Sequence, residues 1–308
     1  MRALCTRAAF LIAAVWVIVS IAFLCVYALP GDPARLVLGQ RATPEALAEF
    51  RLRAGLDEPL YRRYVAFLRR TAELDFGESL VQRRPVQDLI LERAPQTAGL
   101  IAAAVASVLV FSFVLPILLR LLGTRSGLRV FERFWAGAAV APPYVLAVVV
   151  LAIFAGWLNW VPAIFEPSQL RSWALPALVL AAYPTAIVLR LFHQQMEQAF
   201  NSPYVLRARA MGFSERRILL SEVLPNALTT ALAALANGLA FFVTGTFFVE
   251  VVFGISGLGG LTYDAIRNKD IALLVGLCIV FAVSITAISV TLEAALRFLN
   301  PRLREAHA

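Results

Sequence analysis

Six long apolar runs with uncharged interiors are the strongest constraint on what this chain can fold into. An α-helix needs about 20 predominantly apolar residues to cross the hydrocarbon core of a bilayer. Hydrophobic residues make up 60% of the 308-residue chain and charged residues only 16%, whereas about a quarter of an ordinary soluble domain is charged. The sequence therefore predicts an all-α polytopic membrane helix bundle with six transmembrane helices, near residues 8–29, 97–119, 134–160, 173–189, 227–249 and 271–296.

The connections between these runs suggest how the chain is divided. The first run follows Arg2 and Arg7, but it is too long for a signal peptide and no small-residue cleavage pattern follows it, so we expect an uncleaved span. The expected parts are a first transmembrane helix over 1–30, an external helical cap over 31–96, a five-helix core over 97–299 with a cytoplasmic coupling loop at 193–225, and a cytoplasmic tail over 300–308.

The basic residues indicate the orientation. The net charge is +8, which in a soluble protein would suggest nucleic acid as a partner. Here arginines gather in one set of short connections, and basic residues near span ends stay on the cytoplasmic side. The eleven arginines of 31–96 accompany ten acidic residues in a long loop, and such loops translocate regardless of charge. We expect both termini in the cytoplasm and no nucleic-acid partner.

Several chemistries are disfavoured by what the sequence lacks. A charge at the bilayer centre is costly and marks proton relays or ion coupling, and the span interiors have none. The only lysine, Lys269, lies between Asn268 and Asp270, so no P-loop is present. Two histidines, and three cysteines without a paired spacing, give neither a nucleophile with its base nor a metal knuckle. The sequence predicts no catalytic, cofactor or metal site.

One cytoplasmic segment has clear helix punctuation. Ser202 and Pro203 suit a helix start, Gly212 suits its end, and Ser214 starts a second helix that we expect to break at Pro225. So short a helix is marginal in water, so it must pack on its own spans or on a partner protein. Apolar side chains form a stripe suited to docking in a groove, flanked by basic ones: Tyr204, Val205, Ala208 and Met211, with Arg207, Arg209, Arg216 and Arg217 beside them.

This segment resembles the cytoplasmic "EAA" loop of ATP-binding-cassette (ABC) importer permeases of the dipeptide and oligopeptide type, in its stretches 204–212 and 224–228. The connection between the fifth and sixth runs is similar to the outer connection of the same family, at 250–253, 257–261 and 264–266. Further matches follow in order at 29–33, 56–60, 77–80 and 93–97, so the resemblance covers nearly the whole chain. It departs at Leu206, Arg207 and Glu222, where the motif has Glu, Ala and Ile, and at Met211, where peptide-type members often carry Lys.

The resemblance implies a type I ABC importer permease fold in a multi-pass protein of the inner membrane. Its implied partners are a second homologous permease chain, cytoplasmic ABC ATPase subunits and an external solute-binding protein, with peptide-like cargo and no cofactor. The ATPase-coupling residues would be Tyr204, Arg207, Ala208, Arg209, Ala210, Gly212, Arg216, Leu224 and Pro225. The external loop would use Glu250, Phe253, Gly257, Gly259 and Asp264 toward the binding protein.

Three questions stay open at the level of sequence. Weakly polar residues inside apolar runs could contact cargo or bond between helices; they are Asn237, Thr244, Thr246 and Ser284. The alternative to a transport subunit is a passive channel or membrane scaffold without an ATPase partner. The cargo could be a dipeptide, an oligopeptide, glutathione, an opine or a metal chelate.

Overall fold

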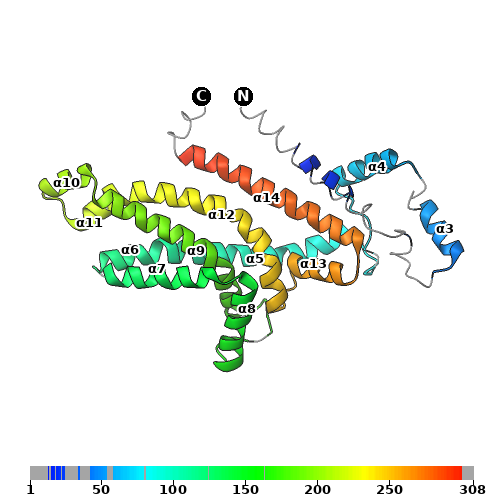
Figure 1. Cartoon of the computed structure of the whole chain (residues 1–308), viewed down its shortest axis with the longest axis horizontal. Coiled ribbons are helices and arrows are strands. Elements are labelled where there is room, and N and C mark those ends of the chain that lie inside the picture. Colours follow the sequence, from blue (N-terminus) through cyan, green and yellow to red (C-terminus); the bar gives the residue numbers. More distant parts are fainter. Residues whose placement is uncertain are drawn as a thin grey trace. The chain divides into compact units, whose positions relative to one another are not determined.

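The computed structural model describes residues 42–53, 58–79, 81–123, 125–162 and 164–299, together with single positions between 13 and 34. These residues form helices and no strand (Figure 1). They pack into two compact units, one of residues 1–95 and 256–286 and the other of residues 96–255 and 287–308. The first predicted span and the predicted tail over 300–308 lie largely outside the described residues, although every described position between 13 and 24 is helical.

The first unit contains the predicted cap. Thr43 starts α3 (Pro44–Arg53) by accepting a hydrogen bond from the Ala46 N–H at 3.3 Å, as a helix cap should. The cap continues after Pro59 in α4 (Leu60–Ala72). Phe23 of the first run lies against Tyr64 and Phe67 of this helix, with ring centroids 5.2 and 5.3 Å apart. The cap therefore rests on the first apolar run by aromatic contacts.

The same unit contains the helix that follows the external loop. Asp270 caps α14 (Ile271–Leu299): its Oδ1 accepts from the Leu273 N–H at 3.2 Å, and its Oδ2 accepts from the Ser79 hydroxyl at 2.5 Å. Gly276 brings α14 against the start of α5 (Val86–Leu109), because a Cβ there would lie 2.7 Å from Val86 Cγ1. The buried carboxylate of Asp270 thus joins segments 191 positions apart in sequence.

The second unit is a bundle around α9 (Leu170–Phe200). α9 lies beside α12 (Leu224–Phe253) in Figure 1, and the two form the most extensive helix contact of this unit. Gly245 of α12 makes that contact close, since a Cβ added there would lie 2.7 Å from Leu180 Cδ1. Inside a membrane there is no hydrophobic driving force between helices, because lipid tails are as apolar as the side chains. Small residues at helix crossings therefore allow the close van der Waals packing that holds membrane helices together.

Four described helical stretches are long and apolar enough to span a membrane: Val86–Leu121, Leu170–Phe200, Glu215–Ala236 and Ile271–Val290. Two further pairs meet the test only as bent pairs. The predicted runs 97–119, 173–189, 227–249 and 271–296 lie in helices, and the first continues from α5 through a π-helical turn, η1 (Val110–Val114), into α6 (Leu115–Leu121). The all-α polytopic class predicted from the sequence is confirmed.

The run 134–160 is not one continuous helix, which corrects the prediction. α7 (Arg125–Val140) ends, and α8 (Pro143–Leu151) with η2 (Ala152–Trp157) leaves at 108°. Pro142 sits at φ −54° and ψ 143°, an extended conformation, because a residue before proline avoids the helical region. A single proline does not have this effect here, since Pro184 lies inside the unbroken α9.

Candidate coupling segment and transport pathway

The cytoplasmic segment predicted between the fourth and fifth runs forms a short helix, α10 (Pro203–Ala210), at one end of α9 (Figure 1). It ends at Gly212, whose φ of +81° is strained for any other residue. The Phe213 N–H bonds back to the Ala208 carbonyl at 3.1 Å, closing the helix end. The predicted helix and its glycine stop are therefore confirmed.

The two serines at the helix starts behave differently. Ser202 was expected to accept from free amides of α10, but its hydroxyl donates to the Ala199 carbonyl at 2.6 Å, so that prediction is wrong. This local hydrogen bond gives a donor to a carbonyl in the last turn of α9, and it competes with capping of α10. Ser214 does cap α11 (Glu215–Arg217), accepting from the Arg217 N–H at 3.4 Å.

The apolar stripe of α10 is divided between the inside and the outside of the bundle. Val205 and Ala208 are 0% and 6% exposed and belong to the core of the second unit. Tyr204 and Met211, with the neighbouring Leu206, are 42%, 61% and 58% exposed. Arg207, Ala210 and Gly212 are exposed too. One face of α10 is thus anchored to the spans, and another presents apolar and basic side chains outward.

An ion pair fixes the turn after α10. Arg209 Nε and Nη2 donate to Glu215 Oε1 and Oε2 at 2.7 and 3.2 Å, a bidentate arrangement across Gly212. The hydrogen bond that Arg209 donates to Glu215 holds the pKa of Arg209 above its ordinary value. The guanidinium carbon of Arg217 lies 4.0 Å above the centroid of the Phe213 ring. These contacts tie α10 and α11 together as one elbow.

The expected break at Pro225 is absent. α11 passes through a π-helical stretch, η3 (Ile218–Val223), directly into α12, and Pro225 lies in the first turn of α12. Proline cannot donate the helical hydrogen bond and crowds the preceding turn, and a wider π-turn accommodates both effects. Leu224 is buried while Pro225 and Arg216 are exposed. The elbow is therefore continuous with the α12 span.

A polar network adjoins the elbow that the sequence did not reveal. Arg120 Nη1 lies 3.2 Å from Glu197 Oε1, and its guanidinium carbon lies 4.4 Å from the centroid of the Phe200 ring. His193 Nδ1 lies 2.7 Å from Glu132 Oε2. The sequence alone does not show which charged residues at span ends form pairs. These residues lie on three different helices, α6, α7 and α9, and only the packing of the helices brings them together. They join three spans beside α10.

The residues expected in the external loop occupy different environments. Glu250 and Phe253 are buried near the end of α12, where Glu250 Oε1 accepts from the Thr97 hydroxyl at 2.7 Å. Gly254, in the left-handed region at φ 66°, ends that helix. Gly257 precedes and Gly259 lies within α13 (Leu258–Arg267) of the first unit, and both are buried, whereas Asp264 is exposed.

The four weakly polar residues expected along the pathway also separate. Thr246 faces the core, is fully buried and donates to the Val243 carbonyl at 2.8 Å. Thr244 is exposed on α12 and donates to the Phe241 carbonyl at 3.1 Å. Ser284 is half-buried on α14, and the side chain of Asn237 lies outside the described residues.

Comparisons with known proteins agree with this architecture. Residues 1–101 match the N-terminal family described as "Binding-prot-dependent transport system membrane comp, N-term". The "Glutathione transport system permease protein GsiC" of Escherichia coli strain K12 is 28% identical over 294 residues, which is 96% of each chain. The protein of the same name from Shigella dysenteriae serotype 1 matches equally. Residues 129–305 match a second family model over more than half of the chain, and the chain belongs to this family of binding-protein-dependent transport system inner membrane components.

Proposed function

We propose that this chain is the permease subunit of an ABC importer for peptides or peptide-like solutes, glutathione among them. Family membership makes it a multi-pass transport subunit of the inner membrane, not an enzyme, that works with ATPase subunits and a solute-binding protein. Several relatives carry glutathione transport in their names, and glutathione is a small peptide. The proposed finer assignments are the cargo, a second permease chain beside this one and both termini in the cytoplasm.

The observation that carries the coupling role is the two-faced packing of α10. Its Val205 and Ala208 are buried in the bundle while Tyr204, Arg207 and Met211 are exposed. A helix anchored on one face can transmit force, and an apolar face with basic neighbours suits a groove on a partner. The coupling segment, defined here as residues 203–217, therefore receives the movement of the ATPase subunits and passes it along the continuous α11–α12 helix.

The energy to be transmitted sets a minimum for this contact. Shifting a two-state bundle from 1:99 to 99:1 needs about 5.5 kcal/mol of differential binding. One exposed ion pair supplies about 1 kcal/mol or less, so Arg207 alone is insufficient. The exposed Tyr204, Leu206 and Met211 add apolar area that a partner groove would bury at about 25 cal/mol per Å².

The exposed face of α12 suits the pathway and the second permease chain. Thr230, Thr244 and Phe248 are exposed along this face. Exposing a hydroxyl group to lipid costs free energy unless it is hydrogen-bonded, so the two threonines favour a protein or aqueous neighbour over lipid. Thr246 points into the core, so it supports the packing on this chain instead of touching cargo. We assign cargo contact to Thr244 and to the open side of α12.

The binding protein would deliver cargo to α13. Leu258, Leu261 and Ala265 fix one face of this helix in the first unit, while Tyr263, Asp264 and Ile266 are exposed on another. Crosslinking tests this surface: a cysteine placed by Asp264→Cys should capture the binding protein, and Ala265→Cys on the buried face should not. Equal capture by both, or by neither, would contradict the assignment.

Reconstitution tests the function as a whole. Vesicles that contain this chain, its second permease, the ATPase subunits and the binding protein should accumulate peptide only with ATP. Replacing Arg207 by Glu, or Gly212 by Leu, should leave ATP hydrolysis running while peptide uptake falls; Arg69→Glu on the exposed face of α4 is the matched charge control. Uptake against a gradient by this chain alone, without an ATPase, would overturn the proposal, and gradient-driven leakage alone would support a passive channel.

A further inference from the structure

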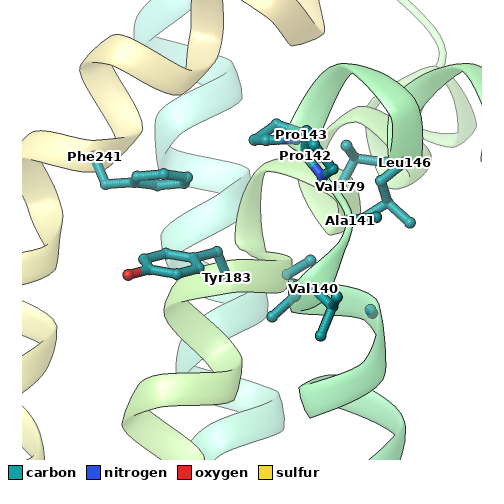
Figure 2. Close-up of a pocket in the computed structure, with 11 residues that line it drawn as sticks. Val140, Ala141, Pro142, Pro143, Leu146, Val179, Tyr183 and Phe241 are labelled. Atoms are coloured by element: carbon teal, nitrogen blue, oxygen red, sulfur yellow. The ribbon is translucent and has the colours of Figure 1, made fainter.

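The break between α7 and α8 opens a pocket inside the second unit. The pocket has a volume of about 230 Å³ and is lined by residues 138–143 of the break, by Leu146 of α8, by Val179 and Tyr183 of α9 and by Phe241 of α12 (Figure 2). The helices on either side of the break, α7 and α8 with η2, are together long and apolar enough to span a membrane as a bent pair. The pocket between them therefore lies in the membrane part of the chain.

The break leaves backbone carbonyls without their helical donors. The carbonyls of Ala138 and Ala139 would normally accept from the amides four residues later, but those residues are Pro142 and Pro143, which have no N–H. Both alanines line the pocket. Non-helical backbone at membrane depth persists only where protein buries it or where it lines a water-filled cavity, so this pocket is not a site for a lipid tail.

Two aromatic rings separate this pocket from a second one. Tyr183 and Phe241 have ring centroids 4.8 Å apart and planes tilted by 32°. Both rings also line a cavity of about 380 Å³ on their other side, with Ile187, Ala234 and Gly238. Ligand pockets in proteins span about 300–1,000 Å³, so the pocket at the break is small alone, whereas the second cavity, and the two cavities joined, are of ordinary ligand size.

The hydroxyl group of Tyr183 can form a further hydrogen bond. Figure 2 shows the two rings one above the other, with the Tyr183 hydroxyl directed away from Val140 and Pro142. Within the described part of the chain, Tyr183 makes no side-chain hydrogen bond, and its side chain is 45% exposed. A phenol in a membrane-spanning helix normally finds a polar partner, and here that partner must come from outside this chain or from water.

We propose that the pocket at the α7–α8 break is a cargo subsite that receives an apolar side chain of a transported peptide, with the Tyr183–Phe241 ring pair as its movable wall. The carbonyls of Ala138 and Ala139 supply acceptors for amide N–H groups, which peptides carry and lipid tails lack. The apolar lining suits a leucine or phenylalanine side chain. This inference rests on the proposed importer function and names which peptides pass best.

Side-chain preference tests the subsite. In the reconstituted complex, uptake of triglycine is compared with uptake of tripeptides that have a central leucine or phenylalanine. Ala139→Leu fills the pocket, and Ala136→Leu adds the same group at an exposed position of α7. We expect Ala139→Leu to lower the phenylalanine-to-triglycine uptake ratio about tenfold, the order of a pocket misfit of a methylene or more. Ala136→Leu should leave that ratio at the wild-type value.

The ring pair has its own matched control. Phe241→Ala removes one wall, while Phe134→Ala removes an exposed phenylalanine of α7 that pairs with Trp135 at 5.7 Å and lines neither cavity. Phe241→Ala should lower discrimination between leucine and phenylalanine tripeptides, and Phe134→Ala should preserve it. Triglycine uptake reports in each variant that the complex has assembled.

Protection of a thiol gives a readout besides transport. The variant Ala139→Cys is made in a chain whose native cysteines are replaced by serine. The phenylalanine tripeptide should slow the reaction of this cysteine with a maleimide by about threefold or more, whereas triglycine should not slow it. Equal labelling with both peptides, together with unchanged uptake ratios in Ala139→Leu, would overturn the subsite while leaving the importer function intact. Failure of the wild-type complex to take up any tripeptide would overturn both.

Discussion

α9 and α12 are both long apolar helices of the same unit, yet they are used differently. In the most apolar window of α9, 67% of the residues are buried, against 39% in the stretch Glu215–Ala236 that leads through η3 into α12. α9 contacts α7, α8, η1, η3, α10 and α12, so it is the centre of the bundle. α12 packs on α9 and α8 and keeps an exposed face with Thr230, Thr244 and Phe248. The difference teaches that apolarity alone does not distinguish a span buried inside the bundle from one with an exposed face.

The first prediction separates the two helices by the largest effect. Phe192 of α9 is fully buried and meets Phe113 edge to face with ring centroids 5.1 Å apart. Phe192→Ala should reduce stability by about 3–5 kcal/mol because it leaves a cavity in a packed core. Phe248→Ala on the open face of α12 should leave the thermal unfolding temperature of the detergent-purified protein unchanged. Equal shifts in the two variants would show that α9 is no more central than α12.

The second prediction compares two glycines of α12. A Cβ at Gly245 would lie 2.7 Å from Leu180 Cδ1, while a Cβ at Gly238 meets nothing within 4 Å. Gly245→Val should cost about 1–3 kcal/mol through overpacking, seen as a lower unfolding temperature. Gly238→Val should unfold like the wild type but reduce peptide uptake in vesicles, since Gly238 lines a cavity. If Gly238→Val transported normally, the open face of α12 would not be the cargo side.

The third and smallest effect concerns the two threonines of α12. Thr246→Val loses one hydroxyl bond to a carbonyl that the helix also uses, so stability should fall by about 1 kcal/mol at most. Thr244→Val should not change stability, but peptide uptake should fall by about twofold to threefold, within the range of one lost hydrogen bond. The measurement is unfolding temperature beside initial uptake rate, and a reversed pattern would contradict the assigned faces.

Much of this architecture could be predicted because it depends on local chemistry. Charge-free runs of sufficient length mark spans, and Gly212 marks the end of α10 because only glycine takes its φ without strain. The run 134–160 was predicted as one span because a single proline, as at Pro184, leaves a membrane helix intact, whereas Pro142 and Pro143 in succession remove adjacent donors. The outward face of α12 could not be found either, since a helix that is apolar all round has no periodicity to show which side meets lipid, protein or cargo.

The coupling segment shows the same limit. Its helix and caps follow from Pro203, Gly212 and Ser214, but the sequence pattern grouped Tyr204 with Val205 in a single apolar stripe. Burial divides that stripe because Val205 and Ala208 meet spans distant in sequence. The π-turns η3 and η1 each precede a proline, Pro225 and Pro116, but a proline alone does not predict a π-turn, since Pro184 lies inside the unbroken α9.

Crosslinking of α10 to its ATPase tests the central claim most directly. Single cysteines are introduced by Met211→Cys, at a position 61% exposed directly after α10, and by Ala208→Cys, at a position 6% exposed within α10. The account predicts that Met211→Cys links to the ATPase subunit in the assembled importer, with a yield that changes when ATP binds, and that Ala208→Cys does not link. Equal linkage at both positions, or none at Met211→Cys in a complex that still imports peptide, would contradict it.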